Sequence, residues 1–464
     1  MRLVAVTTEH SWAQLSLGVL LAYAGSALHE LSTHYIQTSL DDFDRDVHLF
    51  QAGDYILFSN YLWNVDVNLA LCRAIKDRCA VTAIHGGPST PSYRAACEAF
   101  LTDNPWVDFA IHGEGEAPLV DLLRAHRLDP TSRVSIAGVS FCDGDGYVHG
   151  GLSHPVTDLA CIPSPYLLGT FRDACLSNRR LILETNRGCP YRCAYCDWGR
   201  SDTSRVRCFP KARVRAEIEW ACQQQIHELF IADANFGILE RDEEIANWLA
   251  EERIRWGYPK RVIVMLSKKP SKRVVNIVET LARSNLITSG YVGYQTHCRE
   301  VLSLINRDNI SNSDHTDIRA AYRRAGVPIS IQLMFALPGA TVDSFKRDLG
   351  THFFDSSNVQ TYQTYLLPNS PMADPAYVER YRLEADQRGL IISTSTLSRE
   401  DVRYLERLAH LFQFAKTQGG LFYILCYLKW AARVEPIAFL TQLLAYARES
   451  TGLLEALWRD PLPK

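Results

Sequence analysis

The sequence predicts an α/β protein built from a doubly wound, Rossmann-like unit, a partial (β/α)6 barrel of the TIM type and a C-terminal helical cap. Three observations lead to this expectation. Short apolar runs alternate with helical patterns before residue 130, the alternation returns after residue 180, and strand patterns disappear after residue 399. At 464 residues the chain is also too long for one ordinary hydrophobic core. The expected domains are 1–135, 181–385 and 386–464, with a linker over 136–180.

The first unit reads as an open parallel sheet with helices on both faces. Apolar runs typical of buried strands lie at 4–7, 55–59, 81–85 and 109–112. Each run is followed by a helical pattern, at 15–26, 65–76, 92–101 and 117–126 respectively. Because ligands of such sheets bind in the loops at the carboxyl ends of the strands, we expect a binding crevice at that edge.

Residues 128–180 carry little helical pattern and several turn markers, among them Asp143-Gly144 and Asp145-Gly146, so they predict a linker with a hairpin. Strands are then expected at 182–185, 228–231, 262–266, 291–294, 329–334 and 361–366. Helices are expected to begin at residues 193, 242, 271, 299 and 342. This alternation fits a complete or partial parallel barrel, whose active site lies at the carboxyl ends of the strands. In the tail, apolar residues recur at helical spacing, as in Leu405, Leu408, Leu411 and Phe412.

The composition is that of a globular protein, with 47% hydrophobic and 22% charged residues. A net charge of -3 gives no reason to expect nucleic acid or an anionic membrane as a partner. The longest apolar runs, 17–24 and 421–428, are too short to span a bilayer, and the first lacks the features of a signal peptide. We therefore expect a cytoplasmic monomer that acts on a small molecule.

Three of the thirteen cysteines, Cys189, Cys193 and Cys196, fall within eight residues directly after an expected strand. The other ten are scattered and read as small buried hydrophobic residues. Three thiolates can bind three irons of a [4Fe–4S] cluster and leave the fourth iron open to a small chelating molecule. The alternative is a zinc site, which needs a fourth protein ligand, and Cys208 is the nearest candidate.

The CxxxCxxC spacing, with Tyr195 before the last cysteine, resembles the signature of the radical S-adenosylmethionine (SAM) superfamily. The resemblance implies that SAM binds the open iron and is cleaved reductively to a 5'-deoxyadenosyl radical. Tyr195 would then pack near the adenine. Such a reaction requires an external one-electron reductant of the flavodoxin or ferredoxin type.

Further motifs follow successive barrel strands in the order found in this superfamily. Asp233 and Asn235 follow the second strand, where the family recognises the amino group of SAM. Gln295 follows the fourth strand, and Leu337-Pro338 ends the fifth, near the ribose and adenine contacts that the resemblance implies. Each motif alone is ordinary turn chemistry, and only their common order gives them weight.

Three loops of the first unit are similar in order and spacing to the cobalamin-binding domain that precedes many radical SAM domains. Their residues are Ser59, Tyr61, Leu62, Trp63 and Asn64, then Gly86, Gly87 and Pro88, and then Gly113, Glu114, Gly115 and Glu116. No Asp-x-His-x-x-Gly motif occurs, so cobalamin ligated by histidine is not supported, and His85 and His112 read as local polar residues. An apolar residue of the 59–64 loop below the cobalt would leave it weakly ligated there, which favours states that give up an alkyl group.

The joint resemblance implies a cobalamin-dependent methyltransferase. In this reading SAM methylates cob(I)alamin, a radical forms on the substrate, and methylcobalamin delivers the methyl group to an unactivated carbon of a small molecule. Two alternatives stay open: a rearrangement or cyclisation by the same cofactors without methylation, and a non-catalytic cobalamin or iron–sulfur binding module.

Several polar residues near these motifs were assigned by position alone. Tyr365 lies in the last expected strand and Asn369 in the loop after it, and we expect both on the substrate side of the active site as candidate catalytic residues. Glu184, Arg187 and Asp197 would either contact SAM or substrate, or form salt bridges that hold the cysteine loop. Arg205 and Arg207 would lie either over the mouth of the active site or, as the default, on a solvated face.

Overall fold

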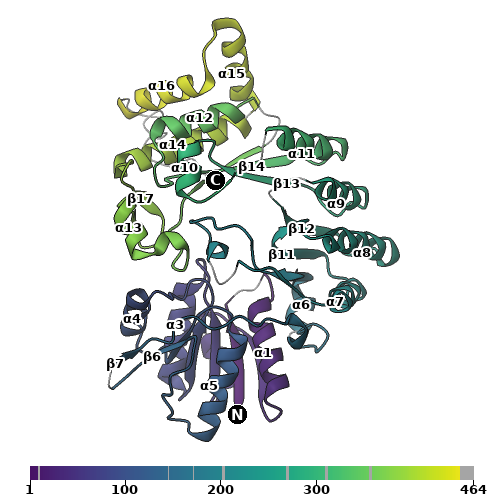
Figure 1. The fold of residues 1–464 in the computed structure, drawn as a ribbon, viewed down its shortest axis with the longest axis vertical. Coiled ribbons are helices and arrows are strands. Elements are labelled where there is room, and N and C mark those ends of the chain that lie inside the picture. The colour runs from purple at the N-terminus through teal and green to yellow at the C-terminus, as the bar shows by residue number, and fades with distance from the viewer. Residues whose placement is uncertain are drawn as a thin grey trace.

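The computed structural model describes residues 1–8, 11–144, 146–170, 172–200, 204–267, 271–308, 312–354, 358–417 and 419–449. The N-terminal sheet lies at one end of the molecule, the barrel strands follow in the middle, and the C-terminal helices cover the other end (Figure 1). Among the described residues, no helix combines the length and the apolar character needed to cross a membrane.

The N-terminal sheet has seven strands in the order β2-β1-β3-β4-β5-β6-β7. Its strands are β1 Arg2–Thr7, β2 Ser32–Gln37, β3 Tyr55–Ser59, β4 Thr82–Gly86, β5 Phe109–Ile111, β6 Val139–Asp143 and β7 Gly146–Val148. The first five strands run parallel, and β6 and β7 add an antiparallel hairpin next to β5. The strand order reverses between β1 and β3, the kind of position at which open α/β sheets bind ligands.

Helices cover both faces of this sheet, as the doubly wound prediction requires. They are α1 Leu15–Ala27, α2 Phe43–Asp46, η1 Val47–Leu49, α3 Val65–Arg78, α4 Arg94–Asp103 and α5 Glu116–Leu128. Helices α1 and α5 share one hydrophobic core, and α3 and α4 contribute to the cores of the opposite face. Strand β2 was not predicted, because its sequence STHYIQ has no apolar run and lies half-buried at the sheet edge.

The predicted hairpin is present, but it belongs to the N-terminal sheet, because β6 pairs with β5 through Ala110 and Ser140. The segment that follows contains η2 Leu159–Cys161 and α6 Arg172–Asn178. It leads into the barrel strands without adding a further strand to the sheet.

All six predicted barrel strands are present, in two parallel three-stranded ladders ordered β12-β11-β8 and β13-β14-β15. They are β8 Arg180–Leu183, β11 Glu228–Phe236, β12 Arg261–Leu266, β13 Gly290–Gln295, β14 Ile329–Phe335 and β15 Asn358–Gln363. The helices are α7 Lys211–Gln223, α8 Arg241–Trp256, α9 Lys272–Arg283, α10 Arg299–Leu304, α11 Asn312–Arg324 and α12 Val342–His352. Short elements complete this part: β9 Asn186–Arg187, η3 Asp197–Gly199 and β10 Arg207–Cys208.

The helix predicted from Cys193 is wrong. The chain instead makes two successive turns, in which Cys196 N–H donates to the Cys193 carbonyl at 3.1 Å and Gly199 N–H donates to the Cys196 carbonyl at 2.9 Å. A Cβ atom at Gly199 would lie 2.1 Å from the Cys193 carbonyl oxygen, which shows how tightly the segment folds on itself. The first barrel helix, α7, begins only at Lys211.

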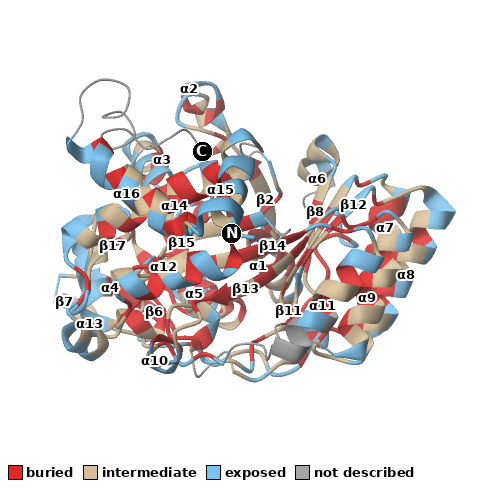
Figure 2. Ribbon diagram, turned by 90° about the horizontal axis from the view of Figure 1, so that it is seen from above, coloured by how far each residue is buried: buried red, intermediate tan, exposed pale blue. Residues whose placement is uncertain are grey.

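The helical prediction for the tail is confirmed through Glu449, and residues 450–457 lie outside the described residues. The helices are α14 Arg399–Thr417, α15 Gly419–Ala432 and α16 Pro436–Glu449, preceded by η4 Pro371–Ala373, α13 Pro375–Tyr381, β16 Glu384–Ala385 and β17 Ile391–Ser393. The apolar stripe of α14, from Leu405 to Phe412, is buried against the barrel side. Figure 2 shows the buried residues concentrated on the strands and on the inner faces of these helices.

Candidate active site

The three clustered cysteines lie on the loop after β9, at the carboxyl edge of the barrel strands. Cys189 and Cys193 are buried, and Cys196 is half-buried in the wall of a cavity. The loop is tied down on both sides, because Ala194 N–H donates to the Ile305 carbonyl at 2.8 Å and the Ala194 carbonyl accepts from Met372 N–H at 2.9 Å. The cysteine positions are thus set by backbone contacts and not by side-chain packing alone.

Side chains of the barrel reach the thiols with N–H donors. The Asn235 amide donates to Cys189 Sγ at 3.1 Å, and the Arg307 guanidinium lies 3.9 Å from Cys193 Sγ. N–H donors and a positive charge stabilise thiolates and the net negative charge of a cluster that three thiolates hold. The residues present therefore fit a [4Fe–4S] cluster bound by Cys189, Cys193 and Cys196.

The zinc alternative needs four donors around one ion. Cys208, the nearest candidate for a fourth ligand, is exposed on β10.

Arg307, which the sequence analysis did not single out, connects several parts of the site. It is buried and donates to the Gly293 carbonyl and, at 2.9 Å, to the Tyr195 hydroxyl. Burial raises the pKa of Tyr195, so its hydroxyl stays protonated. In the sequence, the only indication of a role for Arg307 is its place in the loop after a barrel strand and a short helix. This place does not distinguish it from other arginines.

Replacing Arg307 by methionine is expected to make the reduction potential of the cluster more negative by on the order of 50 mV, since about 59 mV corresponds to a tenfold change in a one-electron equilibrium. The physical reason is the loss of a buried positive charge next to a cluster ligand. Potentiometric titration followed by electron paramagnetic resonance measures this shift. The exposed Arg192 on the same loop is the matched control, and its methionine variant should shift the potential far less because water and salt screen it. Equal shifts in both variants would contradict the assignment.

Two acceptor oxygens on β11 and β13 lack a hydrogen-bond partner. Asn235 Oδ1 and Gln295 Oε1 are both buried without one. Gln295 also has a φ of 63°, and Ala336, just before Leu337 and Pro338, has a φ of 60°. Buried unpaired acceptors and strained backbone concentrate at ligand sites, so this strand edge fits a ligand that carries N–H donors, as SAM does.

Asp233 lies next to this edge, but its carboxylate faces the start of the cysteine loop. Its oxygens accept from Thr185 N–H at 2.8 Å, Thr185 Oγ1 at 2.5 Å, Asn186 N–H at 3.3 Å and Asn186 Nδ2 at 2.7 Å. Burial raises the pKa of Asp233 to about 7. Asp233 therefore links β11 to the segment before the cysteines through these hydrogen bonds. Direct contact of Asp233 with SAM stays a prediction.

An Asp233→Asn variant is expected to lose about 1–3 kcal/mol of unfolding free energy, because the new amide group faces N–H and O–H donors. The wild type should also lose stability relative to the variant as pH rises from about 4 to about 7. A carboxyl whose pKa is higher in the folded state than in the unfolded state binds its proton more tightly when folded, so folding is favoured below that range. Denaturant unfolding at pH 5 and pH 8 measures both effects. Parallel pH profiles for the two proteins would contradict the raised pKa.

A cavity of about 560 Å³, here called the crevice cavity, lies between the carboxyl edge of the N-terminal sheet and the cysteine loop. From the sheet side it is lined by Ser59, Tyr61, Leu62, Trp63, Gly86, Gly87, Pro88, Gly113, Glu114, Gly115 and Glu116. From the barrel side it is lined by Glu184, Arg187, Cys196, Asp197, Trp198, Arg200, Leu367 and Asn369. The three loops predicted to bind cobalamin, residues 59–64, 86–88 and 113–116, are here called the crevice loops. The structure thus brings these loops and Cys196 to one cavity.

Of the loop residues predicted to bind cobalamin, all but Asn64 line the crevice cavity. Its side chain accepts from Tyr61 N–H at 2.7 Å and donates to the Ser59 carbonyl at 3.2 Å, which fixes the shape of the loop. The glycine at position 87 is required by the fold itself, because its φ is 92° and a Cβ atom would lie 2.7 Å from the Asn60 carbonyl oxygen.

The first crevice loop, residues 59–64, presents large apolar groups to the cavity. Tyr61 and Trp63 stack with ring centroids 4.7 Å apart, and Trp63 is 67% exposed. Exposed aromatic surface at a cavity mouth marks a binding surface for a flat or bulky apolar ligand. His85 lies behind this surface, buried against Phe58, and burial lowers its pKa to about 3, so it stays neutral. The cavity therefore fits a corrin ring with Tyr61, Leu62 and Trp63 against one face.

A buried cluster of charges joins the two halves of the cavity wall. Arg187 lies 2.7 Å from Glu116, 3.0 Å from Glu184 and 3.4 Å from Glu114, and Arg207 also pairs with Glu114. Salt bridges around Arg187 were one of the two predicted readings. The prediction of a solvated face holds for Arg205, which is exposed, and is wrong for Arg207, because the acidic loop of the N-terminal sheet covers it.

The two residues predicted on the substrate side lie in different surroundings. Asn369 lines the crevice cavity, but its amide accepts from Ser92 N–H and Oγ at 2.7 Å and donates to the Pro88 and Thr90 carbonyls at 2.9 Å. The polar atoms of Asn369 thus join the barrel to the N-terminal sheet. This geometry gives no support to a catalytic role for Asn369. Tyr365 follows β15, is 38% exposed, and does not line the crevice cavity.

Comparison with known proteins agrees with this geometry. The family model of the Radical SAM superfamily matches residues 183–350. This range begins at the last residue of β8 and contains the cysteine loop and the strands β11, β12, β13 and β14. This part of the chain, residues 183–350, belongs to the radical SAM superfamily. Its members use a [4Fe–4S] cluster and SAM, the two groups that the cysteine loop and the strand edge fit.

Two curated relatives are similar to most of this chain. The cobalamin-dependent radical SAM methyltransferase TokK of Streptomyces tokunonensis is 34% identical over 340 residues, 71% of this chain and 49% of the relative. The 2-(S-pantetheinyl)-carbapenam-3-carboxylate methyltransferase of Streptantibioticus cattleyicolor is 30% identical over 429 residues, 86% of this chain and 62% of the relative. The chain thus spans about half to three fifths of the length of these relatives.

The fold is also that of a solved cobalamin-binding enzyme. The radical SAM methyltransferase TsrM of Kitasatospora setae, solved with cobalamin and a [4Fe–4S] cluster, has a TM-score of 0.62 at 17% identity. The match covers 82% of this chain and 78% of TsrM. At this identity the likeness concerns the fold.

Proposed function

We propose that the protein is a cobalamin-dependent radical SAM methyltransferase that transfers a methyl group from SAM to an unactivated carbon of a small molecule. One observation carries the proposal: the crevice loops of the N-terminal sheet and Cys196 line the same cavity. A corrinoid against Tyr61 and Trp63 and a SAM molecule at the cysteine loop would therefore be neighbours, as methyl transfer between them requires.

When bound, the cluster supplies the electron that cleaves SAM, and cobalamin supplies a carrier for the methyl group. An external one-electron reductant of the flavodoxin or ferredoxin type provides that electron. An sp3 carbon has no lone pair with which to attack SAM, which is the chemical reason for a radical route.

The residues of the chain bind and orient the reactants. Asn235 Oδ1 and Gln295 Oε1 accept hydrogen bonds from SAM, and Arg307 holds the Tyr195 hydroxyl so that its ring lies beside the cysteine loop. The apolar side chains of the first crevice loop, residues 59–64, would pack against the corrin and would offer no strong ligand to the cobalt. None of the described residues that line the crevice cavity is a histidine.

The relatives suggest the substrate class. One of them methylates a 2-(S-pantetheinyl)-carbapenam-3-carboxylate, and it aligns with 86% of this chain. We therefore propose a bicyclic β-lactam carboxylate as the substrate, bound between the cysteine loop and the crevice cavity.

Anaerobic incubation of the reconstituted protein with methyl-labelled SAM, cobalamin, a strong reductant and this carbapenam tests the proposal. The expected result is a labelled methyl group in the product, together with S-adenosylhomocysteine from the SAM that gives its methyl group and 5'-deoxyadenosine, which carries the hydrogen removed from the substrate carbon. SAM cleavage with an unlabelled, rearranged product would favour the ring-rearranging alternative. A protein that never cleaves SAM would support the non-catalytic binding module instead.

A further inference from the structure

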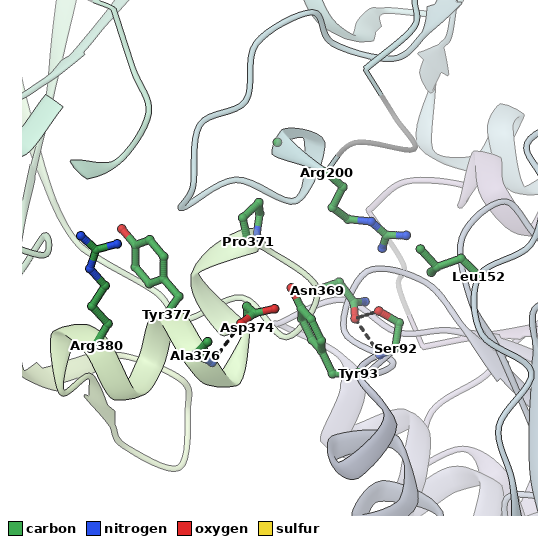
Figure 3. Close-up of a pocket in the computed structure, with 11 residues that line it drawn as sticks. Ser92, Tyr93, Leu152, Arg200, Asn369, Pro371, Asp374, Ala376, Tyr377 and Arg380 are labelled. Carbon is green, nitrogen blue, oxygen red and sulfur yellow. Dashed lines mark hydrogen bonds between the residues drawn. The ribbon is translucent and has the colours of Figure 1, made fainter. Parts of the chain in front are cut away.

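A second cavity, here called the side cavity, adjoins the crevice cavity and has a volume of about 630 Å³. Figure 3 shows Tyr93, Arg200, Tyr377 and Arg380 around it. Arg200 and Asn369 line both cavities, so the two spaces meet at these residues. The volume is that of a small-molecule site.

The two cavities differ in charge. The acidic and basic side chains that line the crevice cavity are Glu114, Glu116, Glu184, Asp197, Arg187 and Arg200. Those that line the side cavity are Arg200, Arg380 and Asp374. Carboxylates outnumber guanidinium groups in the first cavity and are outnumbered in the second, so an anion is favoured in the side cavity.

The aromatic walls of the side cavity are held in place by their hydroxyl groups. Tyr93 donates to the Ser370 carbonyl at 3.2 Å, and Tyr377 donates to the Leu304 carbonyl at 3.0 Å. Burial raises the pKa of both phenols, so they stay neutral and do not repel an anion. Apart from Asp374, the walls between the two arginines are therefore ordered and uncharged.

We infer that the side cavity binds the non-reacting part of a carboxylate-bearing substrate, with the carboxylate on Arg200 and with Arg380 attracting it from the exposed side. This inference rests on the proposed function and adds to it the site of the acid group. Arg200 follows the turn that carries Cys196 and lies 4.0 Å from Asp197, so an acid held there would be anchored beside the cysteine loop. The remainder of the substrate would then extend from Arg200 into the crevice cavity.

Equilibrium binding to the reconstituted holoprotein tests the assignment. The probes are 2-(S-pantetheinyl)-carbapenam-3-carboxylate and its methyl ester, titrated anaerobically by calorimetry. Arg200→Met is expected to weaken acid binding by about 10- to 100-fold, the size of a lost charge-assisted hydrogen bond, and to leave ester binding nearly unchanged. Arg200→Lys, which keeps the charge, should recover part of the affinity.

Arg380 lies at the exposed rim, so Arg380→Met should weaken acid binding only a few-fold and reduce the dependence of the association rate on salt. Arg403→Met is the control, because Arg403 is exposed on α14 and lines neither cavity. Equal binding of acid and ester, no binding of the acid, or an unchanged affinity in Arg200→Met would overturn the inference.

A methyl-transfer assay on the same samples separates the two proposals. Methyl transfer with acid binding that does not depend on Arg200 would refute the anion site and leave the proposed function intact. Arg200-dependent acid binding without methyl transfer would support the anion site and refute the proposed function.

Discussion

Replacing Cys196 by alanine is expected to abolish the cluster, lowering the iron content from about four atoms per chain to near zero after anaerobic reconstitution. Two remaining thiolates, Cys189 and Cys193, cannot hold a cluster that already lacks a fourth protein ligand. SAM cleavage should fall by at least about a thousandfold, because the cluster supplies the electron for that step. Iron analysis, the visible absorption of the cluster and formation of 5'-deoxyadenosine measure these losses.

Cys208→Ala is the matched control for this variant. Cys208 is near the triad in sequence and is exposed on β10, so its removal should leave the iron content and SAM cleavage unchanged. If Cys208→Ala lowered the metal content as much as Cys196→Ala, the site would have four protein donors, and the proposal of an open iron would fail.

Replacing Arg187 by methionine is expected to lower the free energy of unfolding by about 3–5 kcal/mol, the usual cost of removing one partner from a buried ion pair. Arg187 lies within 3.4 Å of Glu114, Glu116 and Glu184, and its loss leaves three carboxylates close together without its charge. Since these carboxylates join the N-terminal sheet to the barrel, cobalamin retention should weaken as well. Denaturant unfolding and cobalt analysis after gel filtration measure the two effects.

The loss should depend on pH. Burial raises the pKa of Glu184 even in the wild type, and removal of Arg187 would raise it further. A carboxyl with a raised folded-state pKa favours folding at low pH, so the variant should be closer to the wild type at pH 5 than at pH 8. Arg180→Met is the control, since Arg180 is 43% exposed and its partner Glu228 keeps Arg261 as a second partner, so the loss should be about 0–1 kcal/mol. Losses of equal size in the two variants would contradict the buried network.

Much of the fold follows from local patterns that the sequence displays. The run Tyr55–Ser59 is apolar at nearly every position because a central parallel strand is buried on both faces, and its predicted bounds are those of β3. Ser271, predicted to begin a helix, caps α9 by accepting from Val274 N–H. Strand β2 and the turns after Cys193 were missed, because a half-buried edge strand and a loop fixed by long-range contacts leave no periodic signal.

The site could be predicted where a motif carries the chemistry, and not where a tertiary contact does. The cysteine spacing and the order of the crevice loops are visible in the sequence, and the structure brings Cys196 and Trp63 to one cavity. Arg307 and Arg207 become recognisable only when folding buries them beside Tyr195 and Glu114. Asn369 was assigned to the substrate by its position after a strand, whereas its amide joins two domains through contacts about 280 residues apart in sequence.

The most direct test is an anaerobic crystal structure of the reconstituted protein, with diffraction recorded at the iron, cobalt and zinc absorption edges. We expect an iron peak at Cys189, Cys193 and Cys196 and a cobalt peak in the crevice cavity beside Tyr61 and Trp63. A zinc peak with four protein donors at the cysteines, or no cobalt between the N-terminal sheet and the barrel, would contradict it.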